Sequence, residues 1–166
     1  MSSPARMTPL SLRPLTPGEA ALAVEVFGQG LSPGPVRLLA LPLWRRAFAA
    51  GPRLLVFPDA LALADFSTAP LPLQGLFVHE LTHVWQAQNG IGLLRAKLRA
   101  GDGPSAYAYD LRDGRGFCEL NIEQQAMVVQ HAFLASRGQA CPHPALSYGA
   151  YLAGLGPSGR DKPWKV

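Results

Sequence analysis

Apolar residues recur along this chain at two different spacings, which predict helices toward both ends and short strands between them. A helix is expected over 16–27, because Thr16 and Glu19 stand at the spacing of a capping box and Pro17 falls on the first helical position. Three short apolar runs predict strands, the last with the weakest pattern: 36–41, 53–57 and 60–66.

Two longer stretches repeat their apolar residues every three or four positions, as buried helices do. The first covers 71–89 and is followed by Gly90, and the second covers 117–136 and is followed by Gly138. Glycine just past the last periodic residue is a common helix stop. A shorter helix is expected over 145–155. Together these elements predict a mainly helical α+β fold with a short antiparallel or mixed sheet.

Length and composition fit a single domain, 1–166, with irregular tails expected at 1–14 and 157–166. The chain has 166 residues, of which 48% are hydrophobic and 16% are charged. No apolar run reaches the length that spans a membrane, so no membrane partner is expected. No continuous apolar segment follows Arg6, which argues against a secretory signal and makes the cytoplasm the default location.

Charge and cysteine content narrow the classes of partner. The net charge is +4, but the basic residues are dispersed, and the cluster at Arg95, Lys97 and Arg99 is interpreted as a solvated face. No alternation of aromatic and basic residues supports binding to nucleic acid. Cys118 and Cys141 lack metal-ligand spacing and are interpreted as buried free thiols.

The first long helix contains the stretch LFVHELTHVWQ, 76–86, which carries the metal-binding pattern HExxH. Residues four apart on a helix project from one face, so His79 and His83 can both reach one zinc ion. Glu80 lies beside the metal, where it can take a proton from a zinc-bound water as a general base. Buried imidazoles need polar partners, and zinc is one. We therefore expect one Zn²⁺ per chain.

A catalytic zinc site also needs a third protein ligand. The metzincin motif would continue with Gly and His where this chain has Gln86 and Asn89, so the ligand must come from elsewhere. The best source is ELNIEQQA, 119–126. There Glu119 and Glu123 lie in a polar seam between two apolar arcs of the second long helix, and buried carboxylates in such a seam need a cation. Both carboxylates are candidates on this reasoning.

The HExxH stretch, followed by a helical Glu123-x-x-Ala126, resembles the gluzincin group of zinc metallopeptidases. This resemblance implies a zincin-like fold in which the sheet packs on an active-site helix and a second, ligand-bearing helix. It implies Glu123 as the third zinc ligand. Glu119, one turn earlier, would then accept a hydrogen bond from a ligand histidine or, as the alternative, be the ligand itself.

A closer resemblance runs over about 15–164. The stretches RPLTPGE, HELTHVWQ, YAYDL, NIEQQA and GRDKPW together resemble small bacterial proteins labelled Vgr-related, whose name connects them with the type VI secretion spike. The resemblance implies a zincin-like peptidase motif and a secretion-system protein as partner. It also implies export by a specialised secretion system as an alternative to the cytoplasmic default. It implies no particular substrate.

The segment SAYAYDL, 105–111, lies between the two ligand helices and offers hydrogen-bond donors for a developing oxyanion. Tyr107 and Tyr109 are both candidates, and Tyr109 is preferred because Asp110 adjoins it. Packing of both tyrosines over the core is an equal alternative. Asp110 itself could orient a ligand histidine. Gly75, one turn before the first histidine, is expected to leave clearance for a ligand or substrate.

Three functions fit these residues. The leading hypothesis is a zinc metallopeptidase-like hydrolase, in which Glu80 activates water to attack a peptide or other amide bond. The competing hypothesis is a zinc-stabilised, non-catalytic binding or adaptor domain associated with a bacterial secretion system, which the small size favours. A third hypothesis is a secreted toxin that cleaves peptidoglycan amide bonds, and the family label alone supports it.

Overall fold

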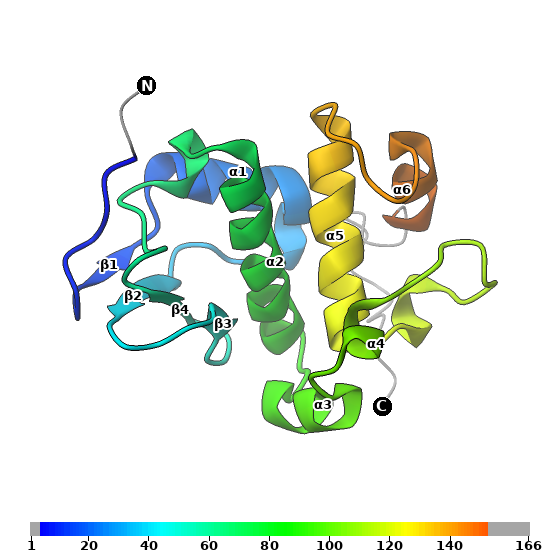
Figure 1. The fold of residues 1–166 in the computed structure, drawn as a ribbon, viewed down its shortest axis with the longest axis horizontal. Helices are drawn as coiled ribbons and strands as arrows, with labels where there is room; N and C mark the ends of the chain where they lie inside the picture. The colour runs from blue at the N-terminus through cyan, green and yellow to red at the C-terminus, as the bar shows by residue number, and fades with distance from the viewer. Residues whose placement is uncertain (1–3, 153–166) are drawn as a thin grey trace.

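The strands form a small mixed sheet at one end of the molecule (Figure 1). The computed structural model describes residues 4–152, and within them the sheet has four strands in the order β1-β2-β4-β3. Their bounds are β1 Leu12–Pro14, β2 Arg37–Leu41, β3 Phe48–Ala49 and β4 Leu54–Pro58. The central pair, β2 and β4, is parallel, whereas β1 and β3 are antiparallel edge strands. The molecule is an α+β protein, with about half of the described residues in helices.

The sequence pattern identified the centre of this sheet and missed its edges. The predicted strands 36–41 and 53–57 are confirmed as β2 and β4. The third, 60–66, is wrong, because the chain turns there and pairs with another segment only through an isolated bridge between Leu63 and Arg6. Arg6 and β1 both lie in the stretch 1–14, which was expected to be an irregular tail. The two-residue β3 is too short for a period of two to be recognised.

The first helix, α1 (Pro17–Phe27), begins at the predicted capping box. Thr16 accepts a hydrogen bond from the backbone N–H of Glu19 at 3.1 Å, and the Glu19 carboxylate accepts one from the backbone N–H of Thr16 at 2.9 Å. The fully buried carboxylate also pairs with Arg13 of β1 through two contacts of 2.7 Å and accepts from the backbone of Phe66 at 2.8 Å. This capping residue therefore also ties α1 to the sheet.

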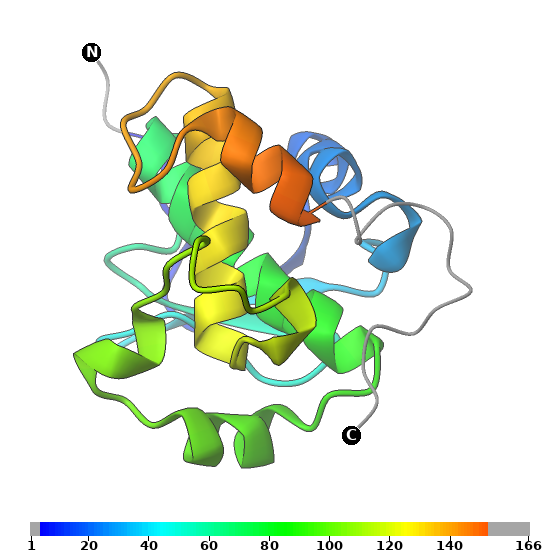
Figure 2. The ribbon, with the colours of Figure 1, turned by 90° about the vertical axis from the view of Figure 1, so that its right-hand side faces the viewer.

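The two long helices pack directly on each other. α2 (Leu71–Gln88) has the sheet on one side and α5 (Ile122–Ser136) on the other (Figure 1), and α5 crosses in front of it in the perpendicular view (Figure 2). Ten consecutive residues of α2, 77–86, are buried. A Cβ atom on Gly75 would lie 3.0 Å from a methyl carbon of Leu134 on α5. Gly75 thus allows close helix packing, and the expectation that it leaves room for a ligand is wrong.

Shorter helices surround this pair. α3 (Leu93–Ala100) and α4 (Pro104–Tyr107) lie near the C-terminal end of α2, and α6 (Ala145–Leu152) lies beside α5. Three 3₁₀ turns complete the helical elements of the described chain: η1 Gly28–Gly30, η2 Phe66–Thr68 and η3 Phe117–Glu119. The predicted helix 117–136 is therefore two elements, since η3 ends before Asn121 caps α5.

Three further expectations concern the surface and the ends of the chain. The interpretation of both cysteines as buried is wrong for Cys118, which is exposed, and Cys141 is partly buried. No helix of residues 4–152 is long and apolar enough to cross a membrane. The predicted tail 157–166 and the last residues of the predicted helix 145–155 lie outside the described residues.

Candidate metal centre

Two histidines of α2 face one carboxylate of α5. His79 and His83 are both buried, one turn apart, and their rings meet edge to face with centroids 5.1 Å apart. Their Nε2 atoms lie 3.5 Å and 3.4 Å from the same atom, Oε2 of Glu123. Glu123 lies in the first turn of α5, so the packing of the two helices brings the three side chains together.

The residues present fit a metal ion. One potential ligand atom from each of His79, His83 and Glu123 lies within 4.8 Å of the others, and in the described part of the chain this is the one such group. Two imidazoles, one carboxylate and an open fourth position form a donor set found in catalytic zinc sites. All three residues are buried, where a cation would balance the carboxylate. The group could therefore hold one metal ion.

Glutamine side chains orient both histidine rings. Nδ1 of His79 lies 3.1 Å from Oε1 of Gln130, and Nδ1 of His83 lies 2.8 Å from Oε1 of Gln86. An amide oxygen only accepts, so each Nδ1 carries a proton. Each Nε2 therefore faces Glu123, where it donates to the carboxylate when the ring is protonated and can bind a metal ion when it is not. Gln86 is itself held, since its amide nitrogen donates to Oε1 of Gln125 at 2.8 Å. Such partners behind the ligands fix tautomer and ring direction.

The second oxygen of Glu123 is held by a lysine of α3. Lys97 Nζ donates to Oε1 at 2.6 Å, while Oε2 faces the histidines. Burial alone would raise the pKa of Glu123, but hydrogen bonds from His79, His83 and Lys97 together lower it well below its ordinary value. The carboxylate is therefore ionised, and its Oε2 atom, which faces both histidines, could bind a cation.

The environment of His83 also favours a positive charge at this position. Burial alone would lower its pKa, but the hydrogen bond to Glu123 and the negative charge of Glu80 raise it overall. In the absence of a metal, the site therefore stabilises a positive charge on the imidazole. A site built from two carboxylates and two imidazoles attracts a cation.

Glu80 is a buried carboxylate that lines the same cavity as the three ligand-type residues. Its Oε2 atom has no hydrogen-bond partner among the described residues. Burial raises the pKa of the Glu80 carboxyl, and the nearby His79 and His83 only partly offset that effect. A carboxyl group with a raised pKa and one unpaired oxygen, beside a set of possible metal ligands, is suited to accept and return a proton.

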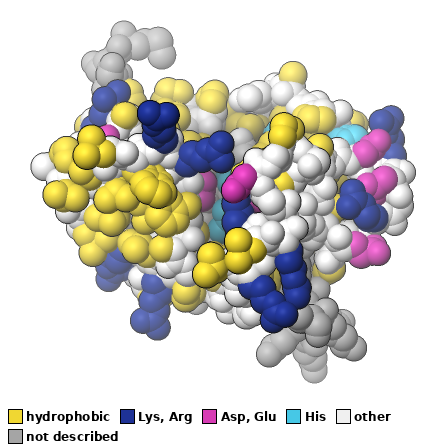
Figure 3. All heavy atoms as spheres, turned by 60° about the horizontal axis from the view of Figure 1, so that its bottom comes forward, with side chains coloured by type: hydrophobic (Ala, Val, Ile, Leu, Met, Phe, Trp, Pro, Cys, Tyr) yellow, Lys and Arg dark blue, Asp and Glu magenta, His cyan; other side chains and the backbone are white. Residues whose placement is uncertain are grey.

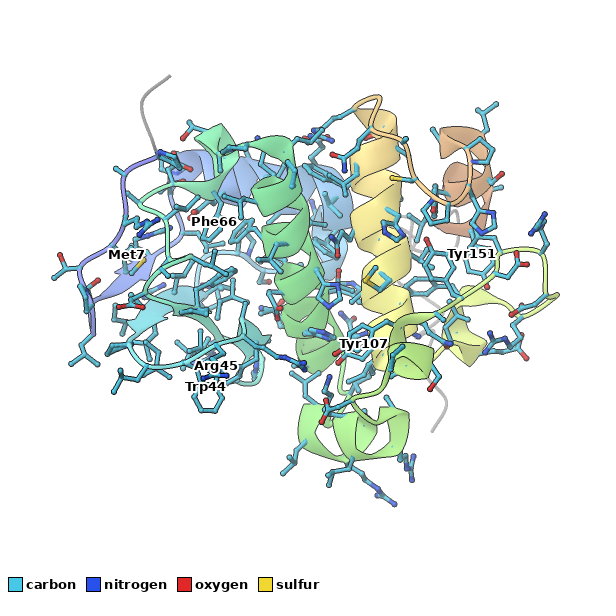
Figure 4. The ribbon with its side chains drawn as sticks, viewed as in Figure 1. Met7, Trp44, Arg45, Phe66, Tyr107 and Tyr151 are labelled. Carbon is cyan, nitrogen blue, oxygen red and sulfur yellow. The ribbon has the colours of Figure 1, made fainter. Side chains whose placement is uncertain are left out.

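A cavity of about 840 Å³ opens in front of these residues. Its floor is formed by His79, Glu80, His83 and Glu123, and Tyr107 lies on its wall. The Tyr107 hydroxyl accepts a hydrogen bond from Lys97 at 2.9 Å, so one lysine joins this tyrosine to the ligand carboxylate. Figure 4 shows Tyr107 beside the lower ends of α2 and α5, above α3.

The structure places the other tyrosine, Tyr109, in a different cluster. Its hydroxyl lies 2.6 Å from Nδ1 of His131 and 2.8 Å from the hydroxyl of Tyr148, and it does not line the cavity. Burial and the hydrogen bond with Tyr148 raise the pKa of Tyr109. Of the two candidate oxyanion donors, the structure brings Tyr107 to the metal-ligand set, and the preference for Tyr109 is corrected.

The two carboxylates expected to support the histidines also point elsewhere. Glu119 accepts a hydrogen bond from the backbone N–H of Gly116 at 2.7 Å and caps η3. It does not project beside Glu123, because the helical phase is broken between η3 and α5. Asp110 is half-exposed and pairs with Arg112 at 3.0 Å. The hydrogen-bonding role assigned to Glu119 and Asp110 is filled by Gln86 and Gln130.

Sequence reasoning missed three residues of the site. Gln130 lies seven residues after Glu123, two turns along the same helix face, and that spacing was the available signal. Gln86 lies three residues after His83, a spacing that brings two side chains together on a helix. Lys97 was interpreted as part of a solvated face, and no local pattern shows that α3 folds back onto α5.

Comparisons with known proteins connect the whole described fold to one effector domain. No protein-family model matches the sequence. An alignment of 134 residues, which covers 74% of this chain, is 35% identical to the type VI secretion system spike protein VgrG2b of Pseudomonas aeruginosa, and the chain spans only 13% of that protein's length. The solved structure of the effector domain of VgrG2b matches with a TM-score of 0.67 and 32% identity, over 93% of this chain and 88% of that domain.

Proposed function

Because the chain belongs to the family of the VgrG2b effector domain, we propose that it is an effector-type zinc hydrolase that cleaves a peptide or other amide bond. Its proposed ligands are His79, His83 and Glu123, and its proposed general base is Glu80. We further propose that it acts with a type VI secretion assembly, because the relative is a domain of a spike protein. That proposal favours export over the cytoplasmic default.

The hydrolase proposal rests on one observation: a buried carboxylate, Glu80, whose Oε2 atom has no hydrogen-bond partner among the described residues, lies beside a buried His-His-Glu group. An unsatisfied buried carboxylate reduces stability, by about 1–3 kcal/mol or more. The residue is one position from a ligand on α2, so it faces the cavity without displacing that ligand. A purely structural metal site would need the three ligands but not Glu80.

In the proposed hydrolysis, each residue of the site has a separate role. A bound zinc ion supplies Lewis-acid polarisation of the carbonyl and lowers the pKa of water. Glu80 takes the proton of the attacking water and returns it to the leaving amine, a transfer that its raised pKa favours. Lys97 holds one oxygen of Glu123, and Tyr107 lies on the wall where it could donate to the oxyanion.

Exchange of Glu80→Gln tests this assignment. The variant should keep its zinc and fold but lose at least about a hundredfold in turnover, because the amide cannot take up the proton. Zinc-loaded protein would be incubated with a mixed peptide library and with cell-wall fragments, and the products followed by mass spectrometry. Glu25→Gln is the matched control, since Glu25 is an exposed residue of α1 paired with Arg137.

The second candidate function is a metal-stabilised binding domain without catalysis. The observation that favours it is the family itself, because the relative forms part of a secretion spike protein. Zinc-loaded wild-type protein that is inert on both substrate collections would support this second function and contradict the first. Cleavage by wild type that persists in Glu80→Gln would exclude Glu80 as the base.

A further inference from the structure

The cavity in front of the metal-ligand set lies between two segments that are distant in sequence. One wall is formed by Trp44 and residues 46–52, which include the edge strand β3, and the other by 91–94, where α3 begins. β3 pairs with β4 on one side only, so an extended chain could add to its other side by main-chain hydrogen bonds. The cavity is thus a passage between a strand edge and a helix.

Large apolar side chains stand exposed on both walls. α3 contains no buried residue; its Leu94 lines the cavity and is 78% exposed, and Leu98, one turn further along α3 and outside the lining, is 77% exposed. On the opposite wall Trp44 is 51% exposed and packs against Phe48 of β3, with ring centroids 5.7 Å apart. Figure 3 shows hydrophobic side chains on both sides of the hollow in which histidine and acidic atoms are visible. Such a concentration around a cavity indicates a surface that a partner covers.

The rims of the cavity are also basic. Arg45 and Arg46 are exposed beside Trp44, and α3 carries the exposed residues Arg95 and Arg99. Figure 3 shows Lys and Arg side chains on both sides of the hollow, and Figure 4 shows Arg45 next to Trp44 at the end of the sheet. Apart from the carboxylates of the site, the acidic residue lining the described cavity is Asp102, which pairs with Lys97 at 3.2 Å. The rims therefore favour an acidic ligand.

We infer that the site takes an extended polypeptide whose side chains at the scissile bond are large and apolar and whose flanks are acidic. This inference rests on the proposed hydrolase function and specifies its substrate class. Leu94 and Trp44 would cover the apolar side chains, β3 would pair with the main chain, and the arginines would meet the acidic flanks. Peptidoglycan amide bonds are surrounded by small, polar or charged groups, which would leave Leu94 and Trp44 exposed to water.

Peptide binding to the zinc-loaded Glu80→Gln protein tests the inference separately from hydrolysis. Three labelled glycine-serine peptides serve as probes: a leucine pair flanked by aspartates, a serine pair flanked by aspartates, and a leucine pair flanked by lysines. Fluorescence anisotropy should give the first peptide a Kd about tenfold or more below that of the serine peptide, because burying leucine side chains contributes at least that much. Its Kd should also lie below that of the lysine-flanked peptide, because the exposed arginines attract aspartates and repel lysines. Wild-type protein would be given the same peptides and its products analysed by mass spectrometry.

A surface variant shows where the peptide binds. The double substitution Leu94→Ser with Leu98→Ser should weaken binding of the leucine–aspartate peptide by about tenfold. Leu146→Ser is the matched control, because Leu146 is 89% exposed on α6 and does not line the cavity. Circular dichroism verifies that both variants keep the wild-type fold.

The outcomes separate this inference from the function on which it rests. Equal binding of the leucine and serine peptides, or an unchanged Kd in the double variant, would overturn the inference. Cleavage of all peptides without preference would also overturn it and would leave the hydrolase proposal standing. Selective binding of the leucine–aspartate peptide without cleavage by wild type would contradict hydrolysis and support the groove as an apolar peptide-binding site.

Discussion

Two carboxylates share the metal site, and their surroundings move their pKa values in opposite directions. Glu80 is buried without a partner for Oε2, and its pKa is raised. Glu123 is buried too, but His79, His83 and Lys97 donate to it, and its pKa is lowered. Opposite shifts in neighbouring carboxyl groups are typical of sites that need one proton acceptor and one permanent anion. The proposed roles of Glu80 as general base and Glu123 as ligand are thus distinguished by their hydrogen-bond partners.

Lys97→Met should lower the free energy of unfolding of the metal-free protein at pH 7 by about 1–2 kcal/mol, because it removes a cation from a buried carboxylate. This loss in free energy of unfolding is smaller than for a fully buried ion pair, because the Lys97 side chain is 35% exposed and water screens its charge. Urea denaturation measures the change. Arg112→Met, which breaks an exposed ion pair with Asp110, is the matched control and should change stability little.

The destabilisation caused by Lys97→Met should depend on pH. The folded-state pKa of Glu123 is lowered from 4.5, so its contribution to stability is present above pH 4.5 and is lost as pH falls through the folded-state value. The difference between Lys97→Met and wild type should therefore narrow in acid. A difference that is equal at all pH values, or one no larger than that of Arg112→Met, would show that the Lys97–Glu123 pair does not stabilise the site.

The arrangement of α2 and α5 is the structural basis of the site at the scale of elements. Glu123, Gln130 and Leu134 recur along the face of α5 that meets α2, where they contact His83, His79 and Gly75 in turn. The close packing of Gly75 against Leu134 thus belongs to the same helix interface as the contact between His83 and Glu123.

Gly75→Leu should lower the free energy of unfolding by about 1–3 kcal/mol, because the new side chain would overlap Leu134. It should also weaken zinc binding, although Gly75 is no ligand, since it would push α5 and Glu123 away from the histidines. Thermal unfolding and a zinc titration measure both effects. Adding Leu134→Ala should recover part of each loss. A variant with normal stability and zinc affinity but impaired substrate binding would restore the original interpretation of Gly75 as clearance.

Local patterns predicted the elements that carry their own signals. The capping box of α1, the two central strands and HExxH on α2 depend on residues close together in sequence, and the structure has all of them. Glu123 was also predicted as a candidate third ligand, because a carboxylate between two apolar arcs of a helix needs a cation. Glu119 was predicted as a candidate on the same helix face as Glu123. No local pattern showed that η3 ends before Asn121 and that Glu119 therefore lies outside the helix that carries Glu123.

The remaining errors concern contacts between segments distant in sequence. The hydrogen bond from Lys97 to Glu123 and the position of Tyr107 on the cavity wall depend on how α3 and α4 fold back under α5. The assignment of Gly75 failed for the same reason, because a helical wheel does not show which neighbour lies opposite a glycine. Periodicity identifies a buried face but not its partner.

At the scale of the whole molecule, the chain places its metal-ligand set at the junction of three units. α2 contributes two histidines and Glu80, α5 contributes Glu123, and the passage between β3 and α3 leads to them. The family of the VgrG2b effector domain shares this fold over 88% of the length of that domain. Under the proposed function, this position between packed helices and a strand edge would combine a rigid metal centre with an open route for a chain-like substrate.

A competitive zinc titration of Glu123→Ala, with Glu119→Ala beside it, tests the two-helix metal centre most directly. Wild-type protein should bind about one zinc ion per chain, Glu119→Ala should match it, and Glu123→Ala should bind at least about a hundredfold more weakly, since it loses a ligand and not merely a partner of one. Unchanged zinc affinity in Glu123→Ala, or an equal loss in Glu119→Ala, would contradict the assignment of Glu123 as the third ligand.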